Sequence, residues 1–267
     1  MIITSRQNES IKAIRSLHDS KGRQQSGLFL TEGLRAVIQA LQSGSEVEKI
    51  VYNPDELVSS LGRETVKEAQ SKGIDTLHVT ADVLDSLARK EKPQGILAVV
   101  KQQWHTLPQT AQTAKGLWLG LEAIQNPGNL GTILRICDAV AAKGLLLFEE
   151  STDPYDPAAV KASMGSIFTV PVYKPSFEAL ETWIEQNQNL SVVGSSDRGA
   201  KDFALFEYPA DCLILMGSER QGLSEKYLSL CSDVVAIPMQ GACDSLNISV
   251  ATGIIAYQAA IQHRTIS

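Results

Sequence analysis

Three polar motifs between residues 126 and 251 combine residue types that can hold a small polar ligand. They are residues 126–135 (NPGNLGTILR), 217–222 (GSERQG) and 237–251 (IPMQGACDSLNISVA). Gly217 and Gly222 permit close backbone approach and positive φ, so the amides and carbonyls around them could cradle a nucleoside-like ligand. The side-chain amide of Asn247 is a directional donor and acceptor. Considered singly, each motif has a plainer explanation: a capped helix with a surface arginine, a strand-to-helix turn with an acid near the helix dipole, or a helix cap.

Each motif directly follows an apolar run that predicts a β-strand. Strands are expected over residues 117–121, 145–148, 191–194, 213–216 and 234–238. The runs are continuous rather than alternating, which is typical of a mainly parallel sheet covered by helices on both faces. Ligands bind such sheets at the carboxyl ends of the strands. We therefore expect the chemistry just after Leu121, Met216 and Ile237, with Asn129 and Ser245 capping the helices that follow.

The first 105 residues predict a separate small α/β domain. Apolar residues at helical spacing predict helices over 8–18, 32–43, 55–72 and 81–89, and strands are expected over 27–31, 49–52, 76–79 and 95–100. The polar segment 106–116, which contains Pro108, predicts a linker. The expected organisation is an α/β domain over 1–105, this linker, and a second α/β domain over 117–267.

The composition excludes several classes of protein. Hydrophobic residues make up 43% of the chain and charged residues 20%, which excludes wholesale disorder. No apolar run approaches the roughly 18 residues of a membrane span, and the first residues lack the apolar core of a secretory signal. The four cysteines show no C-x-x-C spacing, so we expect reduced thiols in a cytosolic protein, without a disulfide framework or a metal site.

Charge is distributed unevenly along the chain. The formal net charge is −6, which argues against a general nucleic-acid coat. Residues 1–105 hold 14 Lys/Arg and 13 Asp/Glu, whereas residues 106–267 hold 10 and 17. The first 35 residues hold six basic side chains and three acidic ones, a bias that is compatible with contact to phosphate. A solvated helix face explains the same residues.

In this order and at strand ends, the three motifs closely resemble those of the SpoU family of RNA ribose 2′-O-methyltransferases, the TrmH-like branch of the SPOUT superfamily. The matching patterns are N-P-x-N-x-G-x-x-x-R at 126–135, G-S-E-x-x-G at 217–222, and I-P-M-x-G followed by S-L-N-I-S-V-A at 237–251. Residues 161–165 (KASMG) resemble the family's K/R-A-S-x-G element, and residues 29–37 (FLTEGLRAV) resemble its ribosomal-protein-like substrate-binding domain. Four residues depart from the family's usual types: Asn126, Cys137, and Cys243 and Asp244 in the loop before Ser245.

The resemblance implies an α/β fold whose carboxyl-terminal stretch forms a trefoil knot, and a homodimer that assembles through the knot region. The knot would bind S-adenosylmethionine mostly through backbone groups. The residues implied at the cofactor are Leu215, Met216, Gly217, Ile237, Met239, Ser245 and Leu246. The residues implied in catalysis are Asn129, Arg135, Glu219, Ser245 and Asn247. No metal is required.

The implied reaction is an in-line attack of a ribose 2′-hydroxyl on the sulfonium methyl group. The family's arginine, here Arg135, is treated as a base, but a guanidinium is effectively always protonated. We therefore expect Arg135 to clamp the adjacent phosphate and stabilise the developing alkoxide, while phosphate or water takes the proton. Asn129 would position the nucleotide and Arg135, and Glu219 would orient Arg135 or the cofactor side of the pocket. Ser245 and Asn247 would complete the catalytic loop.

The basic side chains of the first domain gain a role from the resemblance. The residues expected to dock RNA through phosphate contacts are Arg6, Lys12, Arg15, Lys21 and Arg23, together with Lys161 of the second domain. The expected protein is a cytosolic, homodimeric methyltransferase of rRNA or tRNA. We favour rRNA because the extra domain often accompanies large RNA substrates in this family.

Three other functions stay as alternatives. A non-catalytic RNA-binding or ribosome-assembly protein could retain the fold, although every polar motif position is filled. A nicotinamide-dependent oxidoreductase would need G-x-G-x-x-G, and residues 126–131 lack that spacing. A methyltransferase acting on a tRNA base or on a protein would be excluded by a 2′-O-methyl nucleoside in an RNA digest.

Overall fold

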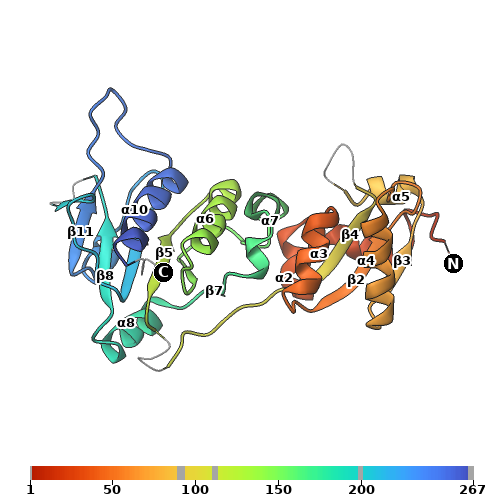
Figure 1. The fold of residues 1–267 in the computed structure, drawn as a ribbon, viewed down its shortest axis with the longest axis horizontal. Helices are drawn as coiled ribbons and strands as arrows, with labels where there is room; N and C mark the ends of the chain where they lie inside the picture. The colour runs from red at the N-terminus through yellow and green to blue at the C-terminus, as the bar shows by residue number, and fades with distance from the viewer. Residues whose placement is uncertain (1, 89–93, 110–113, 198–200, 264–267) are drawn as a thin grey trace. The chain divides into compact units, whose positions relative to one another are not determined.

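The computed structural model describes residues 2–88, 94–109, 114–197 and 201–263. The chain divides into two compact units, whose elements are labelled in Figure 1. The amino-terminal unit comprises Met1–Gln102 together with Asp153–Phe168, and the carboxyl-terminal unit comprises Gln103–Thr152 together with Thr169–Ser267. The domains expected from the sequence were 1–105 and 117–267. The structure differs in that Asp153–Phe168, which lies within the second range, belongs to the amino-terminal unit.

The amino-terminal unit is built on a four-stranded sheet with the order β1-β4-β2-β3. Its strands are β1 (Leu28–Glu32), β2 (Val47–Tyr52), β3 (Asp75–His78) and β4 (Ile96–Lys101). Strand β4 runs antiparallel to both β1 and β2, and β2 runs parallel to β3. Its helices are α1 (Glu9–Ser16), α2 (Ser20–Ser26), α3 (Leu34–Gln42), α4 (Ser60–Ser71), α5 (Ala81–Asp85) and α7 (Pro157–Ser163), followed by a 3-10 turn, η1 (Ser166–Phe168). The predicted small α/β domain is confirmed.

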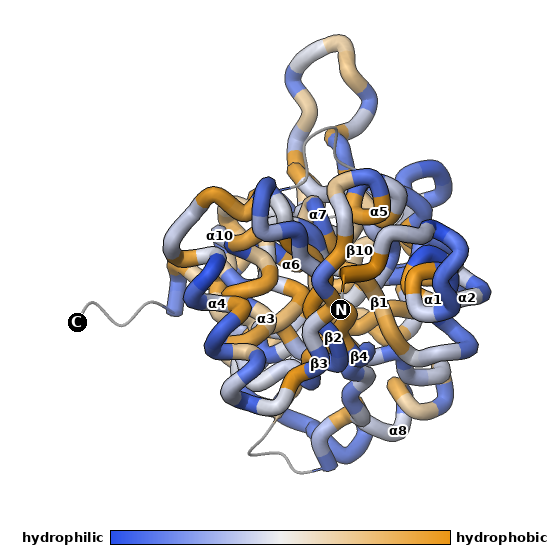
Figure 2. The backbone as a smooth tube through the Cα atoms, turned by 90° about the vertical axis from the view of Figure 1, so that its right-hand side faces the viewer, coloured by the Kyte–Doolittle hydropathy of each residue, from blue (hydrophilic) through white to orange (hydrophobic). Residues whose placement is uncertain are grey.

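Helix α1 was predicted from the spacing of Ile11, Ile14 and Leu17, and all three side chains are buried. Helix α2 was not predicted because its sequence, SKGRQQS, has no apolar residue to mark a buried face. Figure 2 shows α2 as a hydrophilic segment, in contrast to strand β10 (Cys212–Met216). The residue of α2 that enters the core is Arg23, which is only 2% exposed.

Arg23 joins the two parts of the amino-terminal unit, because it lies on α2 and pairs with carboxylates of the segment Asp153–Phe168. Its Nε lies 2.8 Å from Oδ2 of Asp153, and its Nη2 lies 3.5 Å from Oδ2 of Asp156. Its Nη1 donates to the carbonyls of Leu17 and His18 at 3.1 and 3.0 Å. The buried guanidinium therefore has both compensating charge and hydrogen-bond acceptors, as burial of a cation requires.

Aromatic contacts join the same segment to strand β1. The ring centroid of Phe29 lies 4.8 Å from that of Tyr155 and 6.0 Å from that of Phe168. All three rings are buried. The amino-terminal unit thus completes its core with residues that the chain supplies about 130 positions later.

These contacts correct the role predicted for Arg23. The side chain was expected to dock RNA phosphate, but it is buried and its donors are taken by Asp153, Asp156 and two backbone carbonyls. That prediction is wrong. The physical reason is that a basic residue in a polar helix can either pair with buried carboxylates or face water. The sequence of α2 does not distinguish these two possibilities, because it has no apolar residue to mark a buried face.

The carboxyl-terminal unit is a seven-stranded sheet with the order β7-β6-β5-β10-β8-β11-β9. Every strand pairing in it is parallel. The strands are β5 (Leu117–Glu122), β6 (Leu145–Phe148), β7 (Val172–Tyr173), β8 (Ser191–Ser195), β9 (Lys201–Asp202), β10 (Cys212–Met216) and β11 (Asp233–Ala236). The mainly parallel sheet and its five predicted strands are confirmed; β7 and β9 have only two residues each, too few to carry a pattern.

Helices cover both faces of this sheet. They are α6 (Pro127–Ala139), α8 (Phe177–Gln186), α9 (Glu225–Leu228) and α10 (Ile248–Gln262). Leu213 and Leu215 of β10 pack with Leu180 and Trp183 of α8. Because side chains alternate along a strand, Ile214 between them points to the opposite face. Helix α10 contacts β5 and β10 and packs against α6, which supplies the second helical layer.

Two further results bear on the expectations from sequence. Among the helices that the structure describes, none combines the length and apolar character of a membrane span. The trefoil knot implied by the resemblance stays a prediction.

We predict that Arg23→Ala destabilises the protein. Removing one partner of a buried ion pair costs about 3–5 kcal/mol. Asp153 and Asp156 keep 24% and 29% of their side chains exposed, so we expect a smaller loss here, about 2 kcal/mol. Urea unfolding followed by far-UV circular dichroism measures the free energy of unfolding. Lys21→Ala, a change at an exposed position of the same helix, serves as the control, and equal midpoints for the two variants would contradict the structural role of Arg23.

Candidate active site

The three polar motifs meet through a chain of side-chain hydrogen bonds. Nδ2 of Asn247 donates to Oδ1 of Asn129 at 3.1 Å, and Nδ2 of Asn129 donates to Oε1 of Glu219 at 3.1 Å. The first pair is separated by 118 residues in sequence and the second by 90. Glu219 and Asn247 are exposed, and Asn129 is half-buried. The structure therefore brings together one residue from each predicted motif on an accessible surface.

The parallel sheet explains why these motifs meet. Strands β5 and β10 are neighbours, with Leu121 in register with Met216. Since parallel strands end at the same edge of a sheet, the segments that follow β5 and β10 emerge side by side. The first leads into α6 with Asn129, and the second into the turn with Glu219. The expectation that the chemistry lies just after Leu121 and Met216 is consistent with this placement.

The start of α6 differs from the prediction. Asn126, not Asn129, is the N-cap: its Oδ1 accepts from the amides of Gly128 at 2.8 Å and Asn129 at 3.2 Å. Pro127 follows at the first helical position, where its fixed φ suits the helix and its missing N–H costs nothing. Asn129 is thereby freed from capping, and its side chain is available to Asn247 and Glu219.

The start of α10 also differs from the prediction. Ser245 was expected to cap this helix, but Asn247 does so, with Oδ1 accepting from the amide of Ser249 at 2.9 Å and from its hydroxyl at 2.6 Å. The helix-cap explanation for Asn247 is therefore confirmed, and its contact with a ligand stays a prediction. Its oxygen caps the helix, and its amide nitrogen reaches Asn129.

The turn after β10 depends on a glycine that no other residue can replace without movement. Ser218 and Gly222 exchange two backbone hydrogen bonds, at 3.1 and 3.0 Å, and Gly222 has φ +68°. A Cβ atom on Gly217 would lie 1.9 Å from the carbonyl carbon of Gly222. The two backbone segments thus cross in contact, and Glu219 lies at the tip of the turn between them.

A buried carboxylate fixes the far end of this turn. Glu122, the last residue of β5, is 8% exposed, and its Oε2 accepts from the amide of Ser224 at 2.8 Å. The turn is therefore held at Glu219 by Asn129 and at Ser224 by Glu122. Sequence reasoning missed Glu122; the available signal was an acid closing an otherwise apolar run.

Glu149, which follows β6, was missed in the same way. It has φ +51°, and its Oε1 accepts from Nζ of Lys226 at 3.0 Å and from the hydroxyl of Tyr227 at 2.9 Å. Hydrogen bonds from these two side chains lower the pKa of the Glu149 carboxyl. The ends of β5 and β6 thus each carry an acid that fastens the segment after β10.

Arg135 has the properties expected of a ligand-binding cation. It lies off the apolar stripe of α6, which buries Leu130, Ile133, Leu134 and Cys137. Its side chain is exposed. Within the described part of the chain, its guanidinium has no ion pair or hydrogen bond. Its five donors are therefore free for an anionic or hydroxylic ligand.

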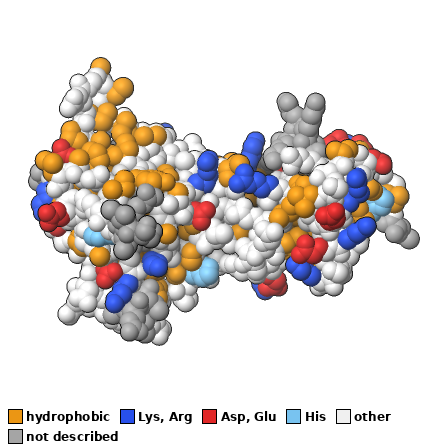
Figure 3. Space-filling view, viewed as in Figure 1, with side chains coloured by type: hydrophobic (Ala, Val, Ile, Leu, Met, Phe, Trp, Pro, Cys, Tyr) orange, Lys and Arg blue, Asp and Glu red, His pale blue; other side chains and the backbone are white. Residues whose placement is uncertain are grey.

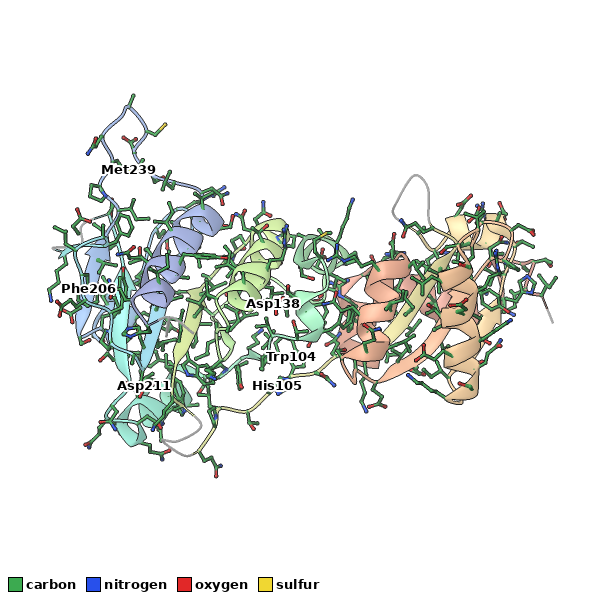
Figure 4. All side chains as sticks on the ribbon, viewed as in Figure 1. Trp104, His105, Asp138, Phe206, Asp211 and Met239 are labelled. Atoms are coloured by element: carbon green, nitrogen blue, oxygen red, sulfur yellow. The ribbon has the colours of Figure 1, made fainter. Side chains whose placement is uncertain are left out.

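The residues predicted at the cofactor fall into two groups. Leu215 and Met216 are buried at the end of β10, and Gly217 is half-buried beside them. Ile237 is half-buried after β11, whereas Met239, Ser245 and Leu246 are exposed on the loop before α10. Figure 4 shows Met239 on this loop, which extends away from the sheet. The structure joins the first group to the Asn129 cluster through the Gly217 turn. Among the described residues, no hydrogen bond joins Met239 or Ser245 to that cluster.

The basic residues predicted to dock RNA differ in availability. Arg6 is paired with Asp82, Lys12 with Glu9, and Arg15 donates to the Ser86 hydroxyl. Lys21 and Lys161 are exposed, and neither has an ion pair among the described residues. Lys161 lies on α7, which belongs to the amino-terminal unit rather than to the second domain as expected.

Other chemistry finds little support in the described residues. No group of three or more His, Cys, Asp or Glu side chains in that part of the chain is arranged to hold a metal ion. Burial raises the pKa of Cys212 to about 12 and that of Cys231 to about 11, so neither thiol is an activated nucleophile at neutral pH.

Two family models match the chain. The model described as the SpoU rRNA Methylase family matches residues 116–257, and the model described as the MRM3-like substrate binding domain matches residues 8–98. The first covers the parallel sheet with all three polar motifs, and the second covers most of the four-stranded sheet.

Individual relatives extend over nearly the whole chain. The 23S rRNA (uridine(2479)-2′-O)-methyltransferase of Streptomyces viridochromogenes is 31% identical over 90% of this chain and 85% of its own length. The 23S rRNA (guanosine(2553)-2′-O)-methyltransferase RlmP of Bacillus subtilis is 26% identical over 96% of this chain and 97% of its own. The AdoMet-bound rRNA methyltransferase of Sinorhizobium meliloti has the same fold, with a TM-score of 0.88, 30% identity and 99% of both chains covered. With its motifs, its fold and these matches in agreement, the chain belongs to the SpoU rRNA methylase family.

Proposed function

We propose that this protein transfers a methyl group from S-adenosylmethionine to a ribose 2′-hydroxyl of rRNA. The observation that carries the proposal is the hydrogen-bonded set Asn247–Asn129–Glu219, with Arg135 on the same helix as Asn129 and without a partner among the described residues. The relatives named as 23S rRNA 2′-O-methyltransferases support the reaction type. The substrate named for these relatives, 23S rRNA, also supports rRNA over tRNA. The match to a substrate-binding domain supports the same choice.

The residues around the turn after β10 fit S-adenosylmethionine. This turn presents backbone groups at the carboxyl edge of a parallel sheet, where such sheets bind nucleotides and related ligands. Leu215, Met216 and Gly217 would contribute from β10, and Ile237, Met239, Ser245 and Leu246 from the segment after β11. When bound, S-adenosylmethionine supplies an electrophilic methyl group on a sulfonium.

Asn129 is oriented for a further hydrogen bond. Its Oδ1 accepts from Asn247 and one N–H of its Nδ2 donates to Glu219, so the second N–H is left for a ligand. Because both neighbours hold the amide in one orientation, this donor is aimed before the nucleotide arrives. Glu219 and Asn247 thus act as positioning residues for Asn129, and Asn129 would hold the nucleotide.

Arg135 would act on the negative charge of the substrate. Its guanidinium remains protonated at any accessible pH, so it cannot take the hydroxyl proton. It can clamp the phosphate next to the target ribose and stabilise the alkoxide as the 2′-oxygen loses its proton. The proton then leaves to a phosphate oxygen of the RNA or to water.

We also propose that the protein is a homodimer of the cytoplasm that assembles through α10. This helix is apolar on all sides, and Val250, Tyr257 and Ile261 are 49%, 41% and 56% exposed. Met239 and Leu246 on the preceding loop are exposed as well. Figure 3 shows hydrophobic side chains gathered over this part of the unit. An apolar patch of this kind marks a protein–protein interface.

We predict that Arg135→Ala lowers methyl transfer strongly. Loss of one group that stabilises transition-state charge costs on the order of 10²–10³ in kcat. The assay uses labelled S-adenosylmethionine with rRNA and tRNA fractions, followed by digestion to nucleosides. We expect label in a 2′-O-methyl nucleoside of rRNA, reduced in Arg135→Ala and unchanged in Lys67→Ala, an exposed cation on α4. Cofactor binding without label in any RNA or precursor particle would favour the alternative of a non-catalytic RNA-binding protein.

We predict that Gly217→Ala weakens binding of S-adenosylmethionine at least tenfold. The new Cβ would lie 1.9 Å from backbone of the same turn, so the turn must move. Gly253→Ala is the matched control, because its Cβ meets only Ile136, at an ordinary 3.4 Å. Isothermal titration calorimetry measures both affinities. Wild-type affinity in Gly217→Ala would show that the turn does not hold the cofactor.

We predict that Tyr257→Glu converts the protein to a monomer. A carboxylate placed in the centre of an apolar interface loses its hydration without gaining a partner. Light scattering coupled to size-exclusion chromatography measures the mass, and Val58→Glu, at another exposed apolar residue (78%), is the control. A monomeric wild type, or a dimeric Tyr257→Glu, would contradict the proposed interface.

A further inference from the structure

The loop between β5 and α6 (Figure 1) carries a glutamine that has no part in the reaction proposed so far. Gln125 immediately precedes Asn126, the N-cap of α6, and its side chain is exposed. Its Nε2 donates to the backbone carbonyl of Ala123 at 3.0 Å and to that of Glu150 at 2.9 Å. The side-chain nitrogen therefore joins the loop after β5 to the loop after β6.

These two contacts determine which way the amide of Gln125 faces. A backbone carbonyl only accepts hydrogen bonds, so the nitrogen of the amide, and not its oxygen, must face Ala123 and Glu150. Nε2 has two N–H groups, and each carbonyl takes one of them. Oε1 consequently faces away from both carbonyls, and it has no hydrogen bond among the residues that the structure describes. Gln125 thus presents an oriented acceptor and no free donor.

The loop that carries this acceptor is fixed at further points. Ile124 is fully buried, and its carbonyl accepts from the amide of Thr152 at 2.7 Å. Ala123 has φ +52°, a left-handed conformation that non-glycine residues rarely adopt, and the hydrogen bond from Gln125 to its carbonyl stabilises it. The acceptor is therefore in place before a ligand arrives, which lowers the entropic cost of binding.

Gln125 lies on the side of the sheet where the RNA is expected. The order of neighbouring strands is β6-β5-β10-β8-β11. The residues proposed to hold S-adenosylmethionine come from β10 and from the segment after β11, whereas Gln125 joins the loops after β5 and β6, on the other side of β10. Asn129 follows Gln125 by four residues, so their Cα atoms are at most about 14 Å apart. This position favours the nucleotide held by Asn129 over the cofactor as the ligand of Gln125.

The RNA bases differ in how well they complement such an acceptor. Oε1 has two lone pairs, and neither is used among the described residues. On its Watson–Crick edge, guanine has two adjacent donors, the ring N1–H and the N2 amine. Uracil has one donor between two acceptors, and adenine and cytosine each have an amine beside an acceptor. Guanine therefore fits an acceptor without a neighbouring donor better than the other three bases do.

We propose that Gln125 is a specificity-determining residue whose Oε1 accepts hydrogen bonds from N1–H and the N2 amine of guanine, the base of the nucleotide that is methylated. The inference rests on the proposed function, because it names the base at the same site. Asn129 would hold the nucleotide, Arg135 would hold its phosphate, and Gln125 would select its base. Such selection requires a base that is splayed out of its helix, as in RNA loops and bulges.

The test uses the full-length protein and begins with bacterial rRNA. The rRNA is methylated with labelled S-adenosylmethionine, and digestion identifies the 2′-O-methyl nucleoside and the fragment that contains it. Transcripts of this fragment are then prepared with guanosine, inosine or adenosine at the methylated position. Inosine keeps N1–H and lacks only the N2 amine, whereas adenosine has an acceptor in place of N1–H and also lacks the N2 amine.

The value of kcat/KM for methyl transfer is measured with each transcript for the wild type and two variants. The variants are Gln125→Ala and, as the matched control, Gln186→Ala, which changes an exposed glutamine on α8 of the same unit. The transcript series examines the wild type by itself, so it tests the proposal even if Gln125→Ala fails to fold. Isothermal titration calorimetry measures the affinity of each protein for S-adenosylmethionine.

We expect the label in 2′-O-methylguanosine. For the wild type, kcat/KM should fall from guanosine to adenosine by roughly tenfold to a hundredfold, the discrimination that a pair of hydrogen bonds to one base supplies, with inosine between them. Gln125→Ala should lower kcat/KM for guanosine by a similar factor and make the three transcripts nearly equal substrates. Gln186→Ala should behave as the wild type does, and all three proteins should bind S-adenosylmethionine equally.

Three results would overturn the assignment of Gln125. The first is label in the 2′-O-methyl derivative of another nucleoside. The second is an equal loss of kcat/KM for all transcripts in Gln125→Ala, which would indicate a structural role in the loop. The third is weaker binding of S-adenosylmethionine by Gln125→Ala, which would assign the acceptor to the cofactor. Absence of methyl transfer by the wild type to any RNA would instead refute the proposed function, and the inference with it.

Discussion

The candidate site depends on one constraint: three segments far apart in sequence must emerge at one edge of a parallel sheet. The chain of hydrogen bonds from Asn247 through Asn129 to Glu219 is the result. Each end of the turn after β10 is fastened to a neighbouring strand or helix, at Glu219 by Asn129 and at Ser224 by Glu122. Because Asn247 also caps α10, the position of that helix and the orientation of the Asn129 amide are set by the same residue.

The two units interleave along the chain. After β6 the chain supplies Asp153–Phe168 to the amino-terminal unit and then returns to β7. Burial of Arg23 makes this exchange necessary, because a buried guanidinium without its carboxylates would carry a large desolvation cost. The segment also brings Lys161 and Met164 into the unit that is matched by a substrate-binding domain. The amino-terminal unit is therefore not complete within the first 105 residues.

Much of the fold was predictable because its signals are local. A strand that is buried on both faces needs a continuous apolar run. The five longer strands of the parallel sheet could therefore be located from such runs in the sequence. The two-residue strands β7 and β9 and the polar helix α2 carry no such run. The helix caps were misjudged at Asn129 and Ser245 because asparagine and serine are good caps at several neighbouring positions. The N-cap of α6 is Asn126, which precedes a proline at the first helical position. The N-cap of α10 is Asn247, whose side chain also donates to Asn129.

The sequence was sufficient for the order of the motifs, their positions after strands and the family, since residue type and spacing are properties of the chain itself. It was not sufficient to decide which polar side chains touch. Lys21 and Arg23 are two residues apart in one short polar helix, yet one is exposed and the other is buried against Asp153 and Asp156. That difference depends on a segment about 130 positions away. No local pattern contains it, because hydrogen bonds and ion pairs form between groups that only the folded chain brings within about 3 Å.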